Sequence, residues 1–141
     1  MYEDDYNTLM EEIKLIQANN EKGEGLHDDD LNTLVDFIYF MYNPDHLKTE
    51  NGTQWKIIKS AIAVMDFLLV KNNRYGNSAL KPIRCFSKID ASQQINNRMD
   101  DKLMRIKNSE EERKNDFVDM TGYLHLKLVD RDWLDLKDLL D

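Results

Sequence analysis

The sequence contains few residues that break a helix or cross-link a chain: 5 Gly, 2 Pro and a single cysteine, Cys85, in 141 residues. The scarcity of glycine and proline argues against a turn-rich all-β fold and favours long helices. One cysteine excludes an intramolecular disulfide and a cysteine-rich zinc site, which is consistent with a reducing cytoplasm. Cys85 is expected to be a small buried apolar residue. The longest apolar run, 61–70, is interrupted by Asp66 and is about half the length that spans a bilayer. The N-terminus, MYEDDYN, lacks the basic and apolar regions of a signal peptide, so we expect a cytoplasmic protein that does not enter a membrane.

Basic residues are fewer than acidic ones: the sequence has 19 Lys and Arg and 27 Asp and Glu, and its net charge is −8. Binding to a DNA backbone depends on clustered basic residues, so direct binding of this kind is not expected. The excess of acid leaves three explanations open: a carboxylate metal site, a basic protein partner, or plain solubility.

Apolar residues recur at helical spacing along most of the chain, which predicts an all-α single-domain helical bundle of five to six helices over residues 1–141. Asp28 or Asp29 can begin the second helix, and Asp90 or Ser92 the fourth. Ser109, with Glu112 three residues later, has the spacing of a capping box and predicts the start of the fifth. The expected helices cover residues 3–19, 28–43, 53–70, 90–106 and 109–130, and a short last helix follows within 131–141.

Two sets of polar residues are aligned on predicted helices. Asp116, Asp119 and Tyr123 are spaced 3 and 4 apart and share one face of the fifth helix. The same spacing aligns three residues of the fourth helix: Arg98, Asp101 and Arg105. If these helices pack antiparallel, the two faces can converge and offer hard oxygen ligands to Mg²⁺ or Mn²⁺, with a diphosphate completing the shell. Basic residues of the fourth helix would then contact phosphate oxygens, namely Arg98, Lys102, Arg105 and Lys107.

The alternative for these residues is a solvated helix face, whose ion pairs contribute only about 0.2–0.5 kcal/mol each. The packed stripe predicted on the fifth helix is Phe117, Thr121, Leu124 and Leu128, and Asp119 lies nearly opposite it. Asp119 is therefore expected to face water unless both sides of the helix are packed, within the chain or across a dimer. Asp66 lies inside the most apolar helix and needs a partner or a metal ion.

Three segments taken together resemble the nucleotide-modification-associated helical domain of phage and bacterial proteins. They are KNNRYGNS at 71–78, MDDKLMRIKN at 99–108 and NDFVDMTGYLHL at 115–126, and the resemblance extends over about residues 69–128. In that family a K-N-x-x-Y-G pattern follows an apolar helix and precedes an acidic-Lys-x-x-Arg helix and a D-x-x-D helix. Arg74 departs from the pattern, where an acidic residue is usual.

The D-x-x-D segment is also similar to one half of the motif of the all-α, MazG-like NTP pyrophosphohydrolases. That similarity implies that Asp101, Asp116 and Asp119 are catalytic residues that bind Mg²⁺, for which Mn²⁺ could substitute. It further implies phosphate contacts from Lys102 and Arg105. The other half of the motif, E-E-x-x-E, is missing from this sequence.

Alongside these helices, the NNRYGNS segment supplies further candidate ligand contacts. Gly76 can end the preceding helix in a left-handed conformation. Tyr75 and Asn77 are then placed to bind the substrate, Tyr75 by stacking on a base, and Tyr123 joins them from the fifth helix.

Two functions from different classes are consistent with these features. The first is a phage-type nucleotide-binding or nucleotide-processing protein, with possible Mg²⁺-dependent hydrolysis of a nucleoside triphosphate or modified nucleotide. The alternative is a small acidic, anti-CRISPR-like phage anti-defence inhibitor that binds a basic nucleic-acid-binding surface of a host protein. Such proteins act in the host cytoplasm. A third hypothesis is a structural or oligomeric accessory protein whose exposed apolar stripes pair with copies of itself, and a homo-oligomer is expected.

Overall fold

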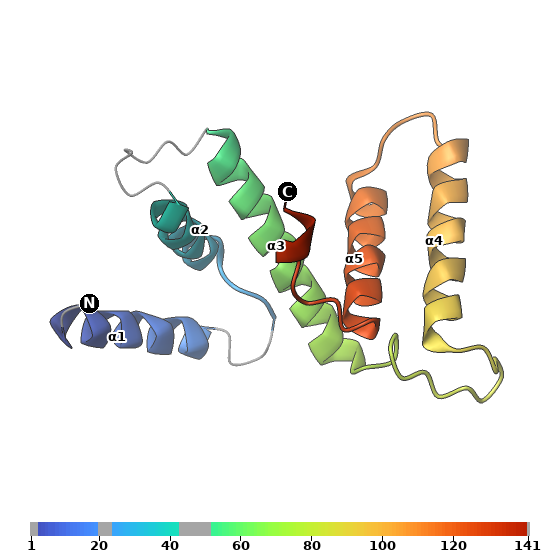
Figure 1. The fold of residues 1–141 in the computed structure, drawn as a ribbon, viewed down its shortest axis with the longest axis horizontal. Helices are drawn as coiled ribbons and strands as arrows, with labels where there is room; N and C mark the ends of the chain where they lie inside the picture. Colours follow the sequence, from blue (N-terminus) through green and yellow to red (C-terminus); the bar gives the residue numbers. More distant parts are fainter. Residues whose placement is uncertain (1–2, 20–23, 43–51, 141) are drawn as a thin grey trace. The chain divides into compact units, whose positions relative to one another are not determined.

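Helices dominate the computed structural model of this chain, which describes residues 3–19, 24–42 and 52–140 (Figure 1). The described residues form five α-helices and one 3₁₀ turn and contain no β-strand, so the predicted all-α class is confirmed. The helices are α1 (Glu3–Asn19), α2 (Asp28–Tyr42), α3 (Thr53–Tyr75), α4 (Ala91–Asn108) and α5 (Lys114–Asp130), and the 3₁₀ turn η1 is Lys137–Leu139. Within the described residues, every helix is too short or too polar to cross a membrane.

The chain groups into two compact units, an N-terminal unit of residues 1–74 and a C-terminal unit of residues 75–141. Each unit is described by itself below. The single domain expected from the sequence stays a prediction.

In the N-terminal unit, polar contacts between side chains join α2 and α3. Trp55 Nε1 donates to Asp36 Oδ1 at 3.0 Å. One turn further along α3, Lys59 Nζ donates to Asn32 Oδ1 at 2.7 Å and to Asp28 Oδ1 at 2.9 Å. The buried apolar side chains of these two helices are Val35, Tyr39 and Ile62. All three contacts come from the first two turns of α3. They reach along α2 from Asp28, its first residue, to Asp36, and so attach the start of α3 to that stretch of α2.

Asp66, for which the sequence predicts a partner or a metal ion, binds the backbone of the segment before α2. The Leu26 backbone N–H donates to both carboxylate oxygens of Asp66, at 3.0 Å to Oδ1 and 3.2 Å to Oδ2. Gly25 precedes this contact with φ +104°, and a Cβ at that position would lie 2.9 Å from Asp66 Oδ2. A side chain at residue 25 would therefore be strained by the backbone conformation and would force the Asp66 carboxylate to shift.

The C-terminal unit is built on the antiparallel pair α4 and α5 (Figure 1). Asp90 caps α4 as predicted, since its Oδ1 accepts from the Gln93 backbone N–H at 2.8 Å. Ile95 and Ala91 are the buried apolar side chains of α4. Near the same end of the pair, Lys127 Nζ donates to Asn96 Oδ1.

Three local predictions need correction. Cys85 is exposed rather than buried. The apolar helix does not end near residue 70 but continues as α3 to Tyr75, where Gly76, with φ +60°, ends it as expected. Ser109 does not begin α5: it follows the last residue of α4, and its N–H donates to Ile106 O. The segment 109–113 connects the helices, and α5 begins at Lys114 because Arg113, in an extended conformation, is its N-cap.

Candidate functional site

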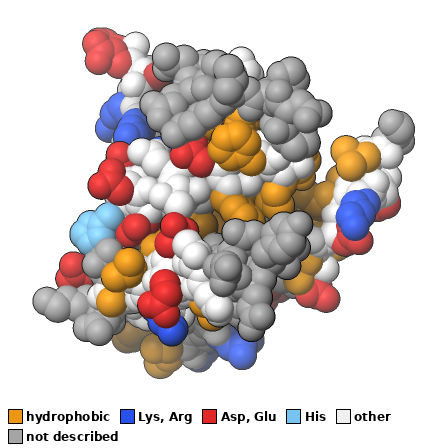
Figure 2. Space-filling model, turned by 90° about the vertical axis from the view of Figure 1, so that its left-hand side faces the viewer, with side chains coloured by type: hydrophobic (Ala, Val, Ile, Leu, Met, Phe, Trp, Pro, Cys, Tyr) orange, Lys and Arg blue, Asp and Glu red, His pale blue; other side chains and the backbone are white. Residues whose placement is uncertain are grey.

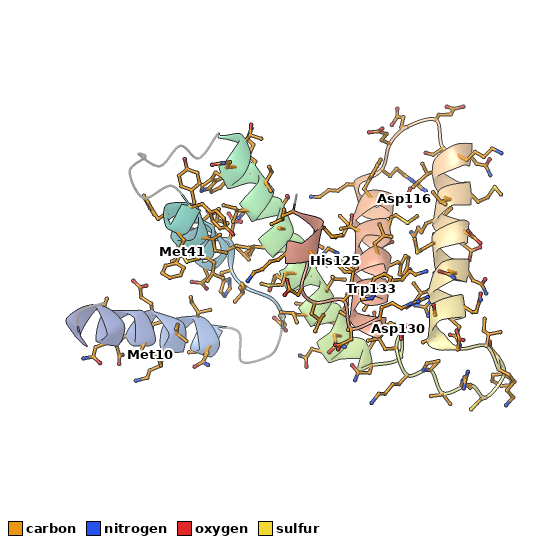
Figure 3. The ribbon with its side chains drawn as sticks, viewed as in Figure 1. Met10, Met41, Asp116, His125, Asp130 and Trp133 are labelled. Carbon is orange, nitrogen blue, oxygen red and sulfur yellow. The ribbon has the colours of Figure 1, made fainter. Side chains whose placement is uncertain are left out.

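Four charged side chains meet where α4 and α5 face each other near the 109–113 connection, and we call them the Lys102 cluster: Lys102, Arg113, Asp116 and Asp119. Lys102 Nζ lies 2.8 Å from Asp119 Oδ2 and 3.4 Å from Asp116 Oδ1. Arg113 Nε donates to Asp116 Oδ2 at 2.9 Å. Figure 3 labels Asp116 on the side of α5 that faces α4. The two carboxylates therefore meet Lys102, whereas the face of α4 predicted to converge on them is that of Arg98, Asp101 and Arg105.

The cluster is unusual in being buried at its centre. Asp116 is 1% exposed and Lys102 is 8% exposed. Charged side chains are rarely buried to this extent unless they are paired, because water no longer solvates them. Each buried charge here has a partner of opposite sign, so the cluster contributes the polar part of the packing between α4 and α5.

The pKa values in the cluster are displaced in the directions that favour the charged forms. The hydrogen bond to Asp119 raises the pKa of Lys102; burial opposes this shift, and the charges of Asp119 and Asp116 support it. Burial pushes the pKa of Asp116 upward, but the hydrogen bonds and charges of Arg113 and Lys102 outweigh burial and leave this pKa below its usual value. Both groups are thus held in their ionised forms at neutral pH.

The arrangement does not fit a Mg²⁺ site as it stands. Two cations, Lys102 and Arg113, face two anions, Asp116 and Asp119, so the cluster carries no net charge for a divalent ion to neutralise. Both carboxylate oxygens of Asp116 already accept from Lys102 or Arg113. Across residues 3–19, 24–42 and 52–140, no group of three or more His, Cys, Asp or Glu side chains is arranged to hold a metal ion. The magnesium ion implied by the resemblance stays a prediction.

The remaining predicted residues of α4 and α5 lie around the cluster rather than in it. Asp101 and Arg105 are exposed on α4, and Tyr123 is half-buried on α5. Asp101 directly precedes Lys102, so its side chain leaves the helix roughly 100° away from the buried lysine. Within the described part of the chain, no hydrogen bond or ion pair joins these three side chains to the cluster.

Asn77 is not brought to the carboxylates. The Asn77 carbonyl accepts from the N–H groups of Leu80 and Lys81, and the segment that follows borders a shallow pocket with Ala91 at the start of α4 and Asp130 at the end of α5. This pocket lies at the end of the helix pair opposite to the Lys102 cluster. Tyr75, two residues before Asn77, is 65% exposed. The predicted substrate contacts of Tyr75 and Asn77 therefore have no common space with Asp116 and Asp119.

Arg113 is the cluster residue that the sequence analysis missed. It was treated as part of the fifth helix, yet its spacing of 3 from Asp116 is the signal that pairs two side chains at a helix start. Lys102 was identified, but as a ligand contact. Its spacing of 7 from Ile95 places it on the buried face of α4, and that spacing was available in the sequence.

A second candidate site follows from how charge divides between the units. Residues 1–74 carry 14 acidic and 7 basic side chains, whereas residues 75–141 carry 13 and 12. The N-terminal unit thus accounts for −7 of the net charge of −8. Three exposed carboxylates of this unit make no ion pair within the described residues: Glu12, Glu24 and Asp29. Figure 2 shows acidic side chains spread over one face of the molecule, with apolar side chains between them.

Comparison with known proteins adds no identification: no family model matches the chain, and no match is found among curated proteins or solved structures. The resemblance to nucleotide-modification-associated and MazG-like proteins therefore stays a prediction from the residues alone.

Proposed function

We propose that this is a binding protein whose acidic N-terminal unit docks on a basic, nucleic-acid-binding surface of another protein. The observation that carries the proposal is the division of charge, with −7 on residues 1–74 and −1 on residues 75–141. A surface that binds nucleic acid is lined with Lys and Arg, and carboxylates can occupy the positions that phosphates otherwise take.

The start of α2 supports this proposal through its local chemistry. Asp28, Asp29 and Asp30 form the first turn of α2, where negative charge is favoured by the unsatisfied N–H groups of the helix. Asp28 pairs with Lys59, but its side chain is still largely exposed. Three adjacent carboxylates can therefore be held on one rigid turn without destabilising the helix that carries them.

Apolar side chains near the C-terminal end of α2 would add the apolar contact area that charged residues alone do not provide. Those that are exposed are Phe37, Phe40, Met41 and Tyr42. Stable protein interfaces generally combine a desolvated apolar centre with a polar rim, and aromatic residues and methionine are enriched in them. Charge on α2 would accelerate the encounter with a basic partner, and the aromatic residues would slow dissociation.

The nucleotide-processing hypothesis would require the side chains of the Lys102 cluster to rearrange. A metal-bound nucleotide at Asp116 and Asp119 would require Lys102 to leave both carboxylates, since Lys102 pairs with each of them. The charge of the cluster is already balanced before any ligand binds. This hypothesis stays a prediction, and the experiment below distinguishes it from the proposed function.

The test begins with capture of a partner at low salt, followed by measurement of the affinity of the purified complex. Changing Glu12, Glu24 and Asp29 together to lysine is expected to weaken binding at least tenfold, because three exposed anionic contacts are reversed. DNA is expected to compete with the protein for its partner, and affinity should fall steeply as salt rises.

A matched control carries the same change of charge in the other unit. Glu110, Glu112 and Asp138 are exposed residues of the C-terminal unit, and their replacement by lysine is expected to weaken binding less than threefold. Equal losses in both triple variants would show that only net charge matters and would overturn the proposal. In parallel, nucleotides with and without Mg²⁺ are expected to leave the unfolding temperature of the wild-type protein unchanged. Stabilisation that requires Mg²⁺ and is lost in Asp119→Asn would favour the nucleotide-processing hypothesis instead.

A further inference from the structure

The side of α5 that faces away from α4 carries a regular apolar stripe. Phe117, Thr121, Leu124 and Leu128 follow one another at spacings of 4, 3 and 4, the repeat that places side chains along one seam of a helix pair. The sequence predicts this stripe as the packed side of the helix. In the structure Thr121 and Leu128 are half-buried, but Phe117 is 48% and Leu124 49% exposed, while α4 packs on the face with Asp116 and Asp119.

The residues after α5 add further apolar surface to the same unit. The chain turns directly after α5, where the Trp133 N–H donates to Leu128 O at 2.9 Å and the Arg131 guanidinium lies 5.6 Å from the centre of the Trp133 ring. Large apolar side chains of this segment are between 51% and 81% exposed. They are Trp133, Leu134, Leu136, Leu139 and Leu140. We group them with Phe117 and Leu124 of α5 and call these exposed apolar side chains of the C-terminal unit the C-terminal apolar surface.

The C-terminal unit has too small a core to leave such a surface uncovered. Its buried apolar side chains are Ala91 and Ile95, and its other buried side chains, Lys102 and Asp116, are charged. Large apolar side chains exposed beside so small a buried core are typical of chains that complete their core by association.

We propose that the C-terminal apolar surface is the interface of a homodimer, in which the α4 and α5 pairs of two copies form a four-helix arrangement with the two α5 stripes in contact. The area is sufficient. The seven side chains of the surface expose on the order of 800 Å², which is the area that each partner contributes to a standard stable interface. Two-helix units of this kind gain a closed core when they pair, as four-helix bundles do.

Charge favours a second copy as the occupant of this surface. The C-terminal unit carries 13 acidic and 12 basic side chains, so two such units approach each other with little repulsion. The N-terminal unit, at −7, would strongly repel its own copy. Self-association is therefore directed to the C-terminal unit, and each dimer presents two acidic N-terminal units to other partners.

The test is the mass of the full-length protein in solution, measured by sedimentation over a range of concentrations. The wild-type chain is expected to sediment with twice its mass of 16.7 kDa. Leu124→Glu places a charge in the middle of the stripe and is expected to give monomers at the same concentration. Leu124→Ala, a milder change at the same residue, is expected to raise the dimer dissociation constant at least tenfold and guards against misfolding of the glutamate variant.

Met104→Glu is the matched control, because Met104 is also apolar and 56% exposed but lies on α4 outside the surface. It is expected to remain dimeric. A monomeric wild-type protein would overturn the proposal, and so would a dimer that both Leu124 variants leave intact. A dimer that Met104→Glu disrupts as strongly as Leu124→Glu would place the interface elsewhere and would equally reject it.

Discussion

Lys102→Met is expected to lower the unfolding temperature of the protein by roughly 10 °C. Methionine matches the length of the lysine stem, so apolar packing against the stem is largely preserved. What is lost is the cation between Asp116 and Asp119, which lies 3.4 Å from one carboxylate and 2.8 Å from the other. Asp116, at 1% exposure, is then left with Arg113 as its one cationic partner in the cluster. Thermal unfolding followed by circular dichroism measures the change.

The control for this prediction is Lys107→Met, which removes a lysine from the exposed surface of the same helix. Exposed charges contribute little to stability, and the unfolding temperature is expected to change by less than about 2 °C. A Lys102→Met variant as stable as the wild type would show that apolar packing replaces the ion pairs, and that the cluster is not what holds α4 against α5.

The pH dependence of stability distinguishes the contribution of the Lys102 amino group from that of the Asp116 carboxylate. The pKa of Lys102 is raised from 10.5, so its contribution is fully present below pH 10.5 and is lost as pH rises through the higher folded value. The pKa of Asp116 is lowered from 3.8, so its contribution is present above pH 3.8 and is lost as pH falls through the lower folded value. The difference in stability between wild type and Lys102→Met should therefore be constant at neutral pH and shrink at both extremes.

Gly25→Ala is expected to cost about 2–4 kcal/mol of unfolding free energy. A Cβ at residue 25 would lie 2.9 Å from Asp66 Oδ2 and 3.2 Å from Val70 Cγ2, and φ is +104°, where side chains are strained. The carboxylate cannot simply rotate away, because both of its oxygens accept from the Leu26 N–H. Urea unfolding of the full-length chain gives the difference.

Gly76→Ala provides the comparison, since Gly76 also has a positive φ, of +60°, but a Cβ there would meet no atom within 4 Å. Its expected cost is about 1 kcal/mol, from the backbone conformation alone. If the two alanine variants were equally destabilised, the close approach of Asp66 would contribute nothing and the contact with Leu26 would have to be weak.

The helices could be predicted from the sequence because their signals are local. The rarity of glycine and proline indicates an all-α chain, and Asp90 marks the start of α4 by its own side chain. The start of α5 was misplaced because the Ser109 and Glu112 spacing satisfies a local rule, whereas the real start depends on Arg113 reaching Asp116. Whether a capping pattern starts a helix therefore also depends on the other contacts that the connecting segment makes.

The candidate site was half predictable for a different reason. Helical spacing placed Asp116 and Asp119 on one face of α5, but on α4 it aligned Arg98, Asp101 and Arg105 and not Lys102, which pairs with both carboxylates. It could not show that Lys102 would be buried between the two acids, since a lysine on a helix face usually remains in water. The prediction from the stripe at Phe117 and Leu124 has the same limit. Its periodicity indicates that the stripe packs against another element, but it does not identify that element.

The Asp66 contact offers a way to observe how firmly the segment before α2 is held. The Leu26 N–H is bound by a side chain and lies outside the helical hydrogen bonds, so it exchanges with solvent deuterium only when the carboxylate of Asp66 releases it. The exchange rate of this single amide therefore reports the detachment of residues 24–27 from α3, whether or not the helices themselves unfold. Protection of Leu26 beyond that of its neighbours would show that Asp66 holds residues 24–27 against α3.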